Sequence, residues 1–141
     1  MAVARETVYA ALFARLANLP QFRFTSRRSR QPKDVTAAEQ PALFLEQMPE
    51  TVDHREGLPP LIALNAVIGV YARTDESNAP PGSILNPLID AVLAALEPDA
   101  CNEALTLGGL VRSCLLGGDI DLDEGIITGQ GLVVIPVIIN L

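Results

Sequence analysis

The sequence predicts an α+β fold, in which an antiparallel β-sheet of about four strands, including one long hairpin, carries two α-helices on one face. The first observation is residues 61–74, where every second residue is apolar, which is the period of a strand. The second is a pair of stretches, residues 4–18 and 83–97, whose apolar residues recur at helical spacing. The third is the strand-like segment of residues 131–141. The predicted order is helix, short strand, hairpin, helix and hairpin.

Composition narrows the class of protein. A chain of 141 residues can bury a stable core without the help of disulfide bonds or metal ions, so we expect a single domain over residues 1–141. Aromatic residues make up only 4 % of the chain, which leaves little material for stacking on bases. The net charge of −7 argues against general nucleic-acid binding, which depends on neutralising phosphates. No apolar run reaches the roughly 18 residues of a membrane span, and Arg5 and Glu6 interrupt any signal-peptide pattern. We expect Cys101 and Cys114 to be reduced core residues of a cytosolic protein.

The first helix is expected over residues 4–18. Val8, Leu12 and Leu16 recur every four residues and form one apolar stripe. Pro20 prevents the helix from continuing. This stripe is predicted to face the sheet.

The long hairpin is expected to follow a short strand and a basic loop. Residues 22–24 alternate as in a strand, and residues 26–33 indicate an exposed basic loop. The first hairpin strand is predicted over residues 42–48, after Pro41, which a strand tolerates at its start. Residues 48–61 are dense in charge and proline and too many for a tight turn, so we expect a mobile loop at the hairpin tip. The candidate partner-binding residues at this tip are Glu50, Asp53, His54, Arg55 and Glu56.

The second helix is expected within residues 83–97. Ser83 can cap it, and Pro87 either fits in the first turn or marks the true start. Pro98 stops it. The chain therefore supplies two helices to lay on one sheet.

The C-terminal third is expected to form the second hairpin. Residues 110–123 alternate near their end, and Gly117 with Gly118 suggests a bend or bulge in the middle. In the last strand, residues 131–141, Pro136 removes a backbone donor, which favours an edge position or a bulge.

Two helices can cover one face of such a sheet, yet the strands carry a second row of apolar side chains. An uncovered apolar face implies a partner, so we expect self-association. The residues of this second row are Leu61, Val67, Tyr71, Leu132, Val134 and Ile138.

Opposite charges are concentrated in separate segments. The basic residues Arg23, Arg27, Arg28, Arg30 and Lys33 lie in one segment. The acidic residues Asp119, Asp121, Asp123 and Glu124 lie in another. The arginines could serve solubility alone, or they could form one side of an interface.

The sequence offers little that could carry catalysis. The segment DIDLDEG resembles a calcium loop, but Glu124 and Gln130 stand where that loop needs glycine and glutamate. A two-metal site built from Asp34, Asp119 and Asp121 lacks a supporting lysine or histidine pattern. The one histidine, His54, has no nucleophile placed near it in a recognisable motif. We expect no enzyme, no metal and no cofactor.

Several segments together resemble one protein family. These are RETVYAALFARL, AEQPALFLEQ, ILNPLIDAVLAALEPD, TLGGLV, GGDIDLDEG and VVIPVIINL. The chain looks like the tail terminator proteins of long-tailed bacteriophages, similar to the minor tail protein U group. Related tail-completion and neck proteins share this layout.

The resemblance implies a ring, typically a hexamer, on the last ring of the tail tube. Such a ring would stop tube polymerisation and offer the surface for head-tail joining, so its partners would be itself, the tail tube protein and a head-tail connector or neck protein. DNA would pass through the lumen without being read. The protein would reside in the virion, at the tail or neck, after assembly in the bacterial host cytoplasm. No catalytic residue is implied.

Two readings of the charged segments follow for a ring. The arginines 27, 28 and 30 of one subunit can pair with Asp119, Asp121 and Asp123 of the next, because contacts around a cyclic ring join two different patches. Alternatively, the acidic row lines the lumen and repels DNA phosphates. The hairpin would then be an assembly arm that reaches a neighbour or the tube. Competing functions are another neck or head-tail connector protein, or a small adaptor or inhibitor domain that binds a host protein.

Overall fold

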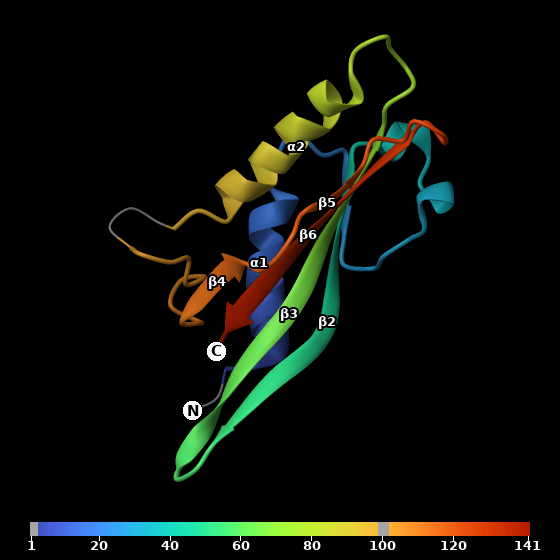
Figure 1. The fold of residues 1–141 in the computed structure, drawn as a ribbon. Helices are drawn as coiled ribbons and strands as arrows, with labels where there is room; N and C mark the ends of the chain where they lie inside the picture. Colours follow the sequence, from blue (N-terminus) through green and yellow to red (C-terminus); the bar gives the residue numbers. More distant parts are fainter. Residues whose placement is uncertain (1–2, 99–101) are drawn as a thin grey trace.

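The computed structural model describes residues 3–98 and 102–141. Two α-helices lie on one face of a mixed sheet (Figure 1). The helices and short 3-10 turns are α1 (Arg5–Ala17), η1 (Pro32–Asp34), η2 (Ala37–Glu39) and α2 (Pro81–Ala95). The strands are β1 (Phe24–Ser26), β2 (Ala42–Arg55), β3 (Leu58–Arg73), β4 (Ser113–Leu116), β5 (Asp121–Asp123) and β6 (Gln130–Asn140).

The described strands form one six-stranded sheet in the order β1-β2-β3-β6-β4, and β5 also pairs with β6. The predicted sheet of about four antiparallel strands is therefore wrong in two respects. First, β1 pairs with β2 in parallel, because the long segment between them returns the chain to the same end of the sheet. Second, residues 110–123 form two short strands instead of one, since the chain leaves the sheet at Gly117 and Gly118, where a bend was expected.

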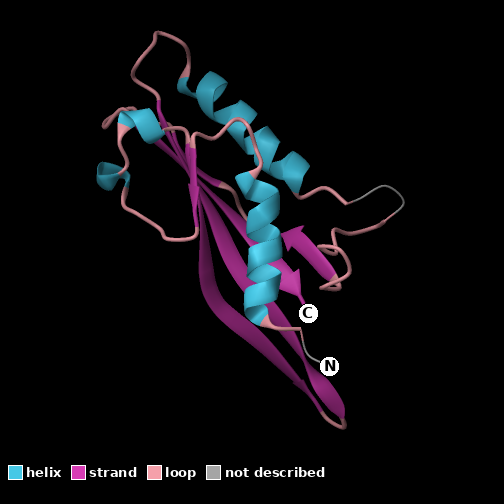
Figure 2. Cartoon of the chain, turned by 180° about the vertical axis from the view of Figure 1, so that it is seen from behind, coloured by secondary structure: helices cyan, strands magenta, loops and turns pink. Residues whose placement is uncertain are grey.

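Both helices cover the same face of the sheet, as predicted (Figures 1 and 2). α1 buries Val8, Leu12 and Leu16, the stripe that its sequence period indicated. α2 begins earlier than expected, at Pro81, whose fixed φ suits the first helical position. Ser83 is not its cap: its hydroxyl donates to the carbonyl of Pro80 at 2.6 Å. Pro87 lies inside the helix at an exposed position.

Strand β3 confirms the predicted alternation. Its residues Leu64, Ala66, Ile68, Val70 and Ala72 are buried beneath the helices, on what we call the helix face. β6 adds Val133, Ile135, Val137 and Ile139 to the same face. The intervening residues of both strands point to the other side, which we call the open face. Its central apolar residues, all partly buried, are Val67, Leu132, Val134, Pro136 and Ile138.

The hairpin is longer and more regular than predicted. β2 runs to Arg55 and β3 begins at Leu58, so a tight turn at Glu56 and Gly57 replaces the expected mobile loop over residues 48–61. Gly57 has a φ of +72°, which favours glycine. Two register shifts, after Met48 and after Asp53, accommodate the irregular composition. The hairpin projects beyond α1 and the rest of the sheet (Figures 1 and 2).

Pro136 does not lie at an edge, because β6 runs between β3 on one side and β4 with β5 on the other. Its carbonyl accepts a bond from the Gly117 amide at 3.0 Å. The nitrogen and the carbonyl of one strand residue point to the same side, so the missing donor faces the gap between β4 and β5. Neither β4 nor β5 pairs with β6 at Pro136, so the sheet tolerates the missing backbone donor at this position.

One end of the open face has a cover of its own. The rings of Phe24 and Tyr71 lie 5.8 and 5.1 Å from that of Phe44, and Val35 and Ala42 complete this small cluster. The Tyr71 hydroxyl donates to the carbonyl of Arg30 at 2.8 Å, which holds the connection between β1 and β2 against the sheet. The remaining open face has no helix over it within the described residues.

Candidate assembly surfaces

The protruding part of the hairpin, residues 51–62, is called the arm from here on. Its base is fixed to α1, because the Arg5 guanidinium donates two bonds to the Glu50 carboxylate, at 2.5 and 2.8 Å. These bonds lower the pKa of Glu50. Beyond them the arm exposes apolar side chains, with Val52 60 % and Leu58 59 % exposed. The arm is a two-stranded extension whose residues are exposed, apart from the partly buried Arg55, Leu61 and Ile62.

The residues predicted for a loop tip lie mostly in a strand. Glu50, Asp53, His54 and Arg55 belong to β2, and Glu56 alone of the five lies in the turn. The Arg55 guanidinium donates to the carbonyl of Pro59 at 3.0 and 2.7 Å, which braces the turn. All but Arg55 are exposed.

Two of the predicted interface arginines have partners within the chain. Arg27 pairs with Glu6 of α1 and lies over the Tyr9 ring at 5.9 Å. Arg30 pairs with Glu39 at 2.9 Å and lies over the Phe24 ring at 4.3 Å. Since both side chains are partly buried, the prediction of an exposed basic loop over residues 26–33 is wrong for them. Their bonds hold the connection between β1 and β2 in place.

The ion pair of Arg30 perturbs Glu39 strongly. The pKa of Glu39 falls from its ordinary 4.5 to about 2, first because of the Arg30 hydrogen bond and then because of the Thr36 amide. Arg23 and Arg28 are exposed. Neither makes an ion pair to a residue within the described ranges.

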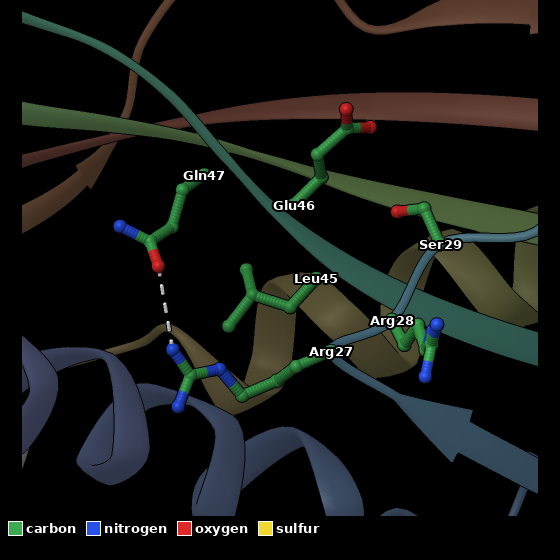
Figure 3. Close-up of a pocket in the computed structure, with 6 residues that line it drawn as sticks. All are labelled: Arg27, Arg28, Ser29, Leu45, Glu46 and Gln47. Atoms are coloured by element: carbon green, nitrogen blue, oxygen red, sulfur yellow. Dashed lines mark hydrogen bonds between the residues drawn. The ribbon is translucent and has the colours of Figure 1, made fainter.

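A hollow of about 590 Å³ lies between the end of β1 and the outer edge of β2. Figure 3 shows Gln47 and Arg27 on one side of the strand, joined by a hydrogen bond of 3.4 Å, with Glu46 and Ser29 on the other side. The hollow exists because β1 stops at Ser26 while β2 continues. Its lining residues are Arg27, Arg28, Ser29, Leu45, Glu46 and Gln47.

The predicted acidic row is exposed and lies at the opposite edge of the sheet. Asp121 and Asp123 pair with Val134 and Leu132, so they point to the open face. The Asp123 carboxylate accepts a bond from the Gly125 amide at 2.9 Å. No ion pair joins this row to the arginines within residues 3–98 and 102–141, and the pairing between subunits stays a prediction. Asp119 lies in the segment between β4 and β5.

The sequence reasoning missed two exposed apolar groups. Ile126 and Ile127, in the turn between β5 and β6, are 84 and 97 % exposed. A backbone hydrogen bond closes the turn, since the Gly129 amide donates to the carbonyl of Gly125 at 2.7 Å. Leu115 and Leu116 of β4 are 45 and 42 % exposed. Two adjacent isoleucines bracketed by glycines were the available signal for the first group.

The chemistry of the described side chains offers no metal centre. Within the described ranges no three His, Cys, Asp or Glu residues are placed to hold a metal ion. Cys114 is a buried free thiol, as expected, and burial raises its pKa to about 11. Cys101 lies outside the described residues. No described helix has both the length and the apolar character needed to cross a membrane.

Comparison with known proteins gives a likeness of fold. No protein-family model matches the sequence. No curated protein matches it either. Among solved structures the fold is similar to a chain described as "Virion of native gene transfer agent (GTA) particle", with a TM-score of 0.52 and 12 % sequence identity. The similarity covers 98 % of this chain and 93 % of that one, so the two chains share the fold over nearly their whole lengths.

Proposed function

We propose that this chain is a structural protein of a phage-like virion, located at the head-proximal end of the tail tube. The observation that carries the proposal is the likeness of fold to a chain of a gene transfer agent virion, which extends over nearly the full length of both chains. A fold alone does not fix a function. The argument therefore also needs surfaces suited to assembly.

Two such surfaces support the proposal. The arm projects from the body with exposed apolar side chains and is anchored at its base by the pair of Arg5 and Glu50. The open face keeps an apolar centre that the helices leave uncovered. Exposed apolar surface on a built element is typical of a contact with another protein.

In its finer form the proposal is that of a tail terminator. Copies of this chain form a ring, typically a hexamer, on the last ring of the tail tube, stop its polymerisation and present the surface to which the head joins. The partners are the tail tube protein and a head-tail connector, and DNA passes through the lumen unread. The role is structural, without catalysis or cofactor.

Electron microscopy of particles assembled without this protein tests the proposal. We expect tubes of uncontrolled length and unattached heads, both corrected when the wild-type chain is supplied. Tails of normal length with unattached heads would instead assign it to a neck or connector position. Normal, joined particles would exclude both roles.

A further inference from the structure

The sheet has two uncovered edge strands, β1 on one side and β5 on the other. Among the strands that the structure describes, β1 pairs only with β2, and β5 only with β6. A bridge between Leu105 and Cys114 covers the outer side of β4, but it lies opposite Ile139, further along β6 than β5. All three residues of β5 are exposed. Uncovered edges are templates for another strand.

The backbone at the middle of β5 points outward. The backbone groups of successive strand residues point to alternate sides, and opposite residues of an antiparallel pair either both face inward or both face outward. The Pro136 carbonyl accepts a bond from the Gly117 amide, so the even-numbered residues of β6 face the side of β4 and β5. The two aspartates of β5 lie opposite such residues and bond to them, which turns the amide and carbonyl of Leu122 outward.

The backbone at the middle of β1 points outward as well. Carried through β3, the same alternation turns the odd-numbered residues of β2 toward β1. The Pro41 carbonyl agrees, since it accepts a bond from the Arg23 amide on that side at 2.8 Å. In a parallel pair, a residue that faces its neighbour strand bonds to the two residues flanking its register partner. Leu43 therefore bonds to both ends of β1, and Thr25 between them faces outward.

The register of the sheet places these two outward-facing residues in one row. The row runs through Leu122, Val133, Val70, Leu43 and Thr25. Three antiparallel steps and one parallel step separate β5 from β1, so the two strands run in opposite directions. A ring whose axis lies along the strands preserves both height and direction. It sets Thr25 of one copy opposite Leu122 of the next, where each can donate one backbone bond to the other.

From this geometry we propose that β5 of one copy adds to β1 of the next copy, as an antiparallel strand that continues the sheet across the subunit boundary. The contact joins two different patches, as a cyclic ring requires. Backbone hydrogen bonds supply affinity, and side chains supply the register. This inference rests on the proposed ring, and names the contact that closes it.

Charges at both ends of the contact match this register. Counting outward from the paired centre brings Arg28 opposite Asp119 and Arg23 opposite Glu124. All four side chains are exposed, and in the described part of the chain none of them takes part in an ion pair or side-chain hydrogen bond. Each arginine therefore gains its first carboxylate partner from the next copy. The contact also covers Leu122, which is 44 % exposed in a single copy.

The antiparallel orientation alone forms both charge pairs. In a parallel contact with the same centre, Arg23 would face Ile120 and Arg28 would face Gly125. Neither arginine would then meet an acid directly. Electrostatic complementarity thus fixes the orientation and the register that the backbone directions indicate.

The outer bridge of β4 does not collide with β1 of the next copy. Cys114 pairs with Ile139 and Ile139 with Leu64, whose row meets β2 at the register shift after Met48. β1 ends before that row, because it pairs only with the first three residues of β2. The hollow of about 590 Å³ beside β2 lies just past the end of β1 and leaves room between the two segments.

Charge reversal in separate molecules tests the contact. Arg28→Glu alters the β1 edge and Asp119→Arg alters the β5 edge, and both positions are exposed, so folding should be spared. We measure mass by light scattering up to the solubility limit, with circular dichroism as the check on folding. Wild type should form oligomers larger than dimers as concentration rises, and each variant alone should lose this association. An equal mixture of the two should regain it, because each reversed charge then meets its opposite.

A mismatched mixture tests the register. Arg28→Glu and Glu124→Arg reverse charges at opposite ends of the contact, so only one of the two contacts in an alternating ring keeps both charge pairs. This mixture should stop at dimers. Asp90→Arg makes the same charge change as Asp119→Arg at an exposed position of α2, and should associate like wild type.

Three results of the mixing experiment would overturn the edge pairing: association of either single variant at wild-type strength, failure of the matched mixture to recover, or equal recovery by the mismatched mixture. A wild-type chain that stays monomeric at the solubility limit would overturn it too. None of these results touches the proposed function, which is judged by tail length in the particles made without the protein.

Discussion

Gln40 and Gln130 exchange two hydrogen bonds across the end of the sheet. The Gln40 amide nitrogen donates to the Gln130 amide oxygen at 2.9 Å, and the Gln130 amide nitrogen donates back at 3.0 Å. Gln40 directly precedes Pro41 and β2, whereas Gln130 begins β6. The pair therefore links the connection between β1 and β2 to β6, a strand that pairs with neither of them.

Replacing Gln40 with alanine should destabilise the protein by about 1 to 3 kcal/mol, because Gln40 is only 6 % exposed and its loss leaves the side-chain oxygen of Gln130 without its donor. Urea denaturation followed by circular dichroism measures the change. Gln21→Ala, at an exposed position, is the matched control and should alter stability by roughly 0.5 kcal/mol or less. Equal effects of the two substitutions would show that the exchanged bonds contribute nothing.

The pair of Arg30 and Glu39 should give a measurable pH dependence. Because the folded pKa of Glu39, about 2, lies below its ordinary 4.5, the stabilisation is complete above pH 4.5 and disappears as pH falls through about 2. In Arg30→Gln the Glu39 pKa should rise toward 4.5, because the Arg30 hydrogen bond is the main cause of its lowered value. The stabilisation should then be lost at a higher pH than in wild type. NMR titration of the Glu39 carboxyl carbon follows this directly, with Arg23→Gln as the control. An unchanged Glu39 titration in Arg30→Gln would contradict the assignment.

Cys114 should resist thiol reagents in the folded protein. Its side chain is buried and its pKa is raised to about 11, so almost no thiolate is present at about pH 8. In a Cys101→Ser background, labelling with a chromogenic disulfide should be slow in buffer and rapid after unfolding in guanidinium. Equally rapid labelling under both conditions would mean that the core around Cys114 opens freely.

The exposed pair Ile126 and Ile127 should matter for assembly and not for folding. Both side chains lie in solvent, so Ile126→Ser with Ile127→Ser should change the free energy of unfolding by roughly 0.5 kcal/mol or less. If the turn anchors a partner, as exposed apolar side chains on a closed turn suggest, the double variant should join fewer heads to tails in a complementation assay. Full complementation would remove this turn from the contact surface. Thr128→Ser, in the same turn, is the control.

The sequence could predict those elements that bury one face in the core, because their apolar residues then recur at a regular spacing. The helix face of β3 and the stripe of α1 follow directly from apolar periods of two and of about 3.6 residues, since each period matches one buried face. The arm could not be predicted this way. Most of its residues are exposed, so its charges and the prolines Pro59 and Pro60 were interpreted as a loop, although β2 and β3 are paired on both sides of these prolines.

The assembly surfaces were predictable only in part. The charges of Arg27 and Arg30 are visible in the sequence, but their partners Glu6 and Glu39 are set by how segments distant from each other fold back together. The parallel pairing of β1 has the same origin. Likewise, the alignment of Leu122 with Thr25 arises through three intervening strands, which no local pattern encodes.

Shortening the arm should separate its role in assembly from folding. Residues 53–61 are all exposed or partly exposed, and replacing them with Asn-Gly closes a two-residue hairpin after Val52, which pairs with Ile62. The anchor between Arg5 and Glu50 remains, so the melting temperature should stay close to that of wild type. Under the proposed function head-tail joining should be lost, because the shortened hairpin lacks the exposed apolar side chain of Leu58 that the arm would offer to a partner. The variant Thr51→Ser keeps the length of the arm and the hydroxyl that accepts a bond from Asn65, and should join normally. Normal joining by the shortened protein would mean that the arm is dispensable for assembly.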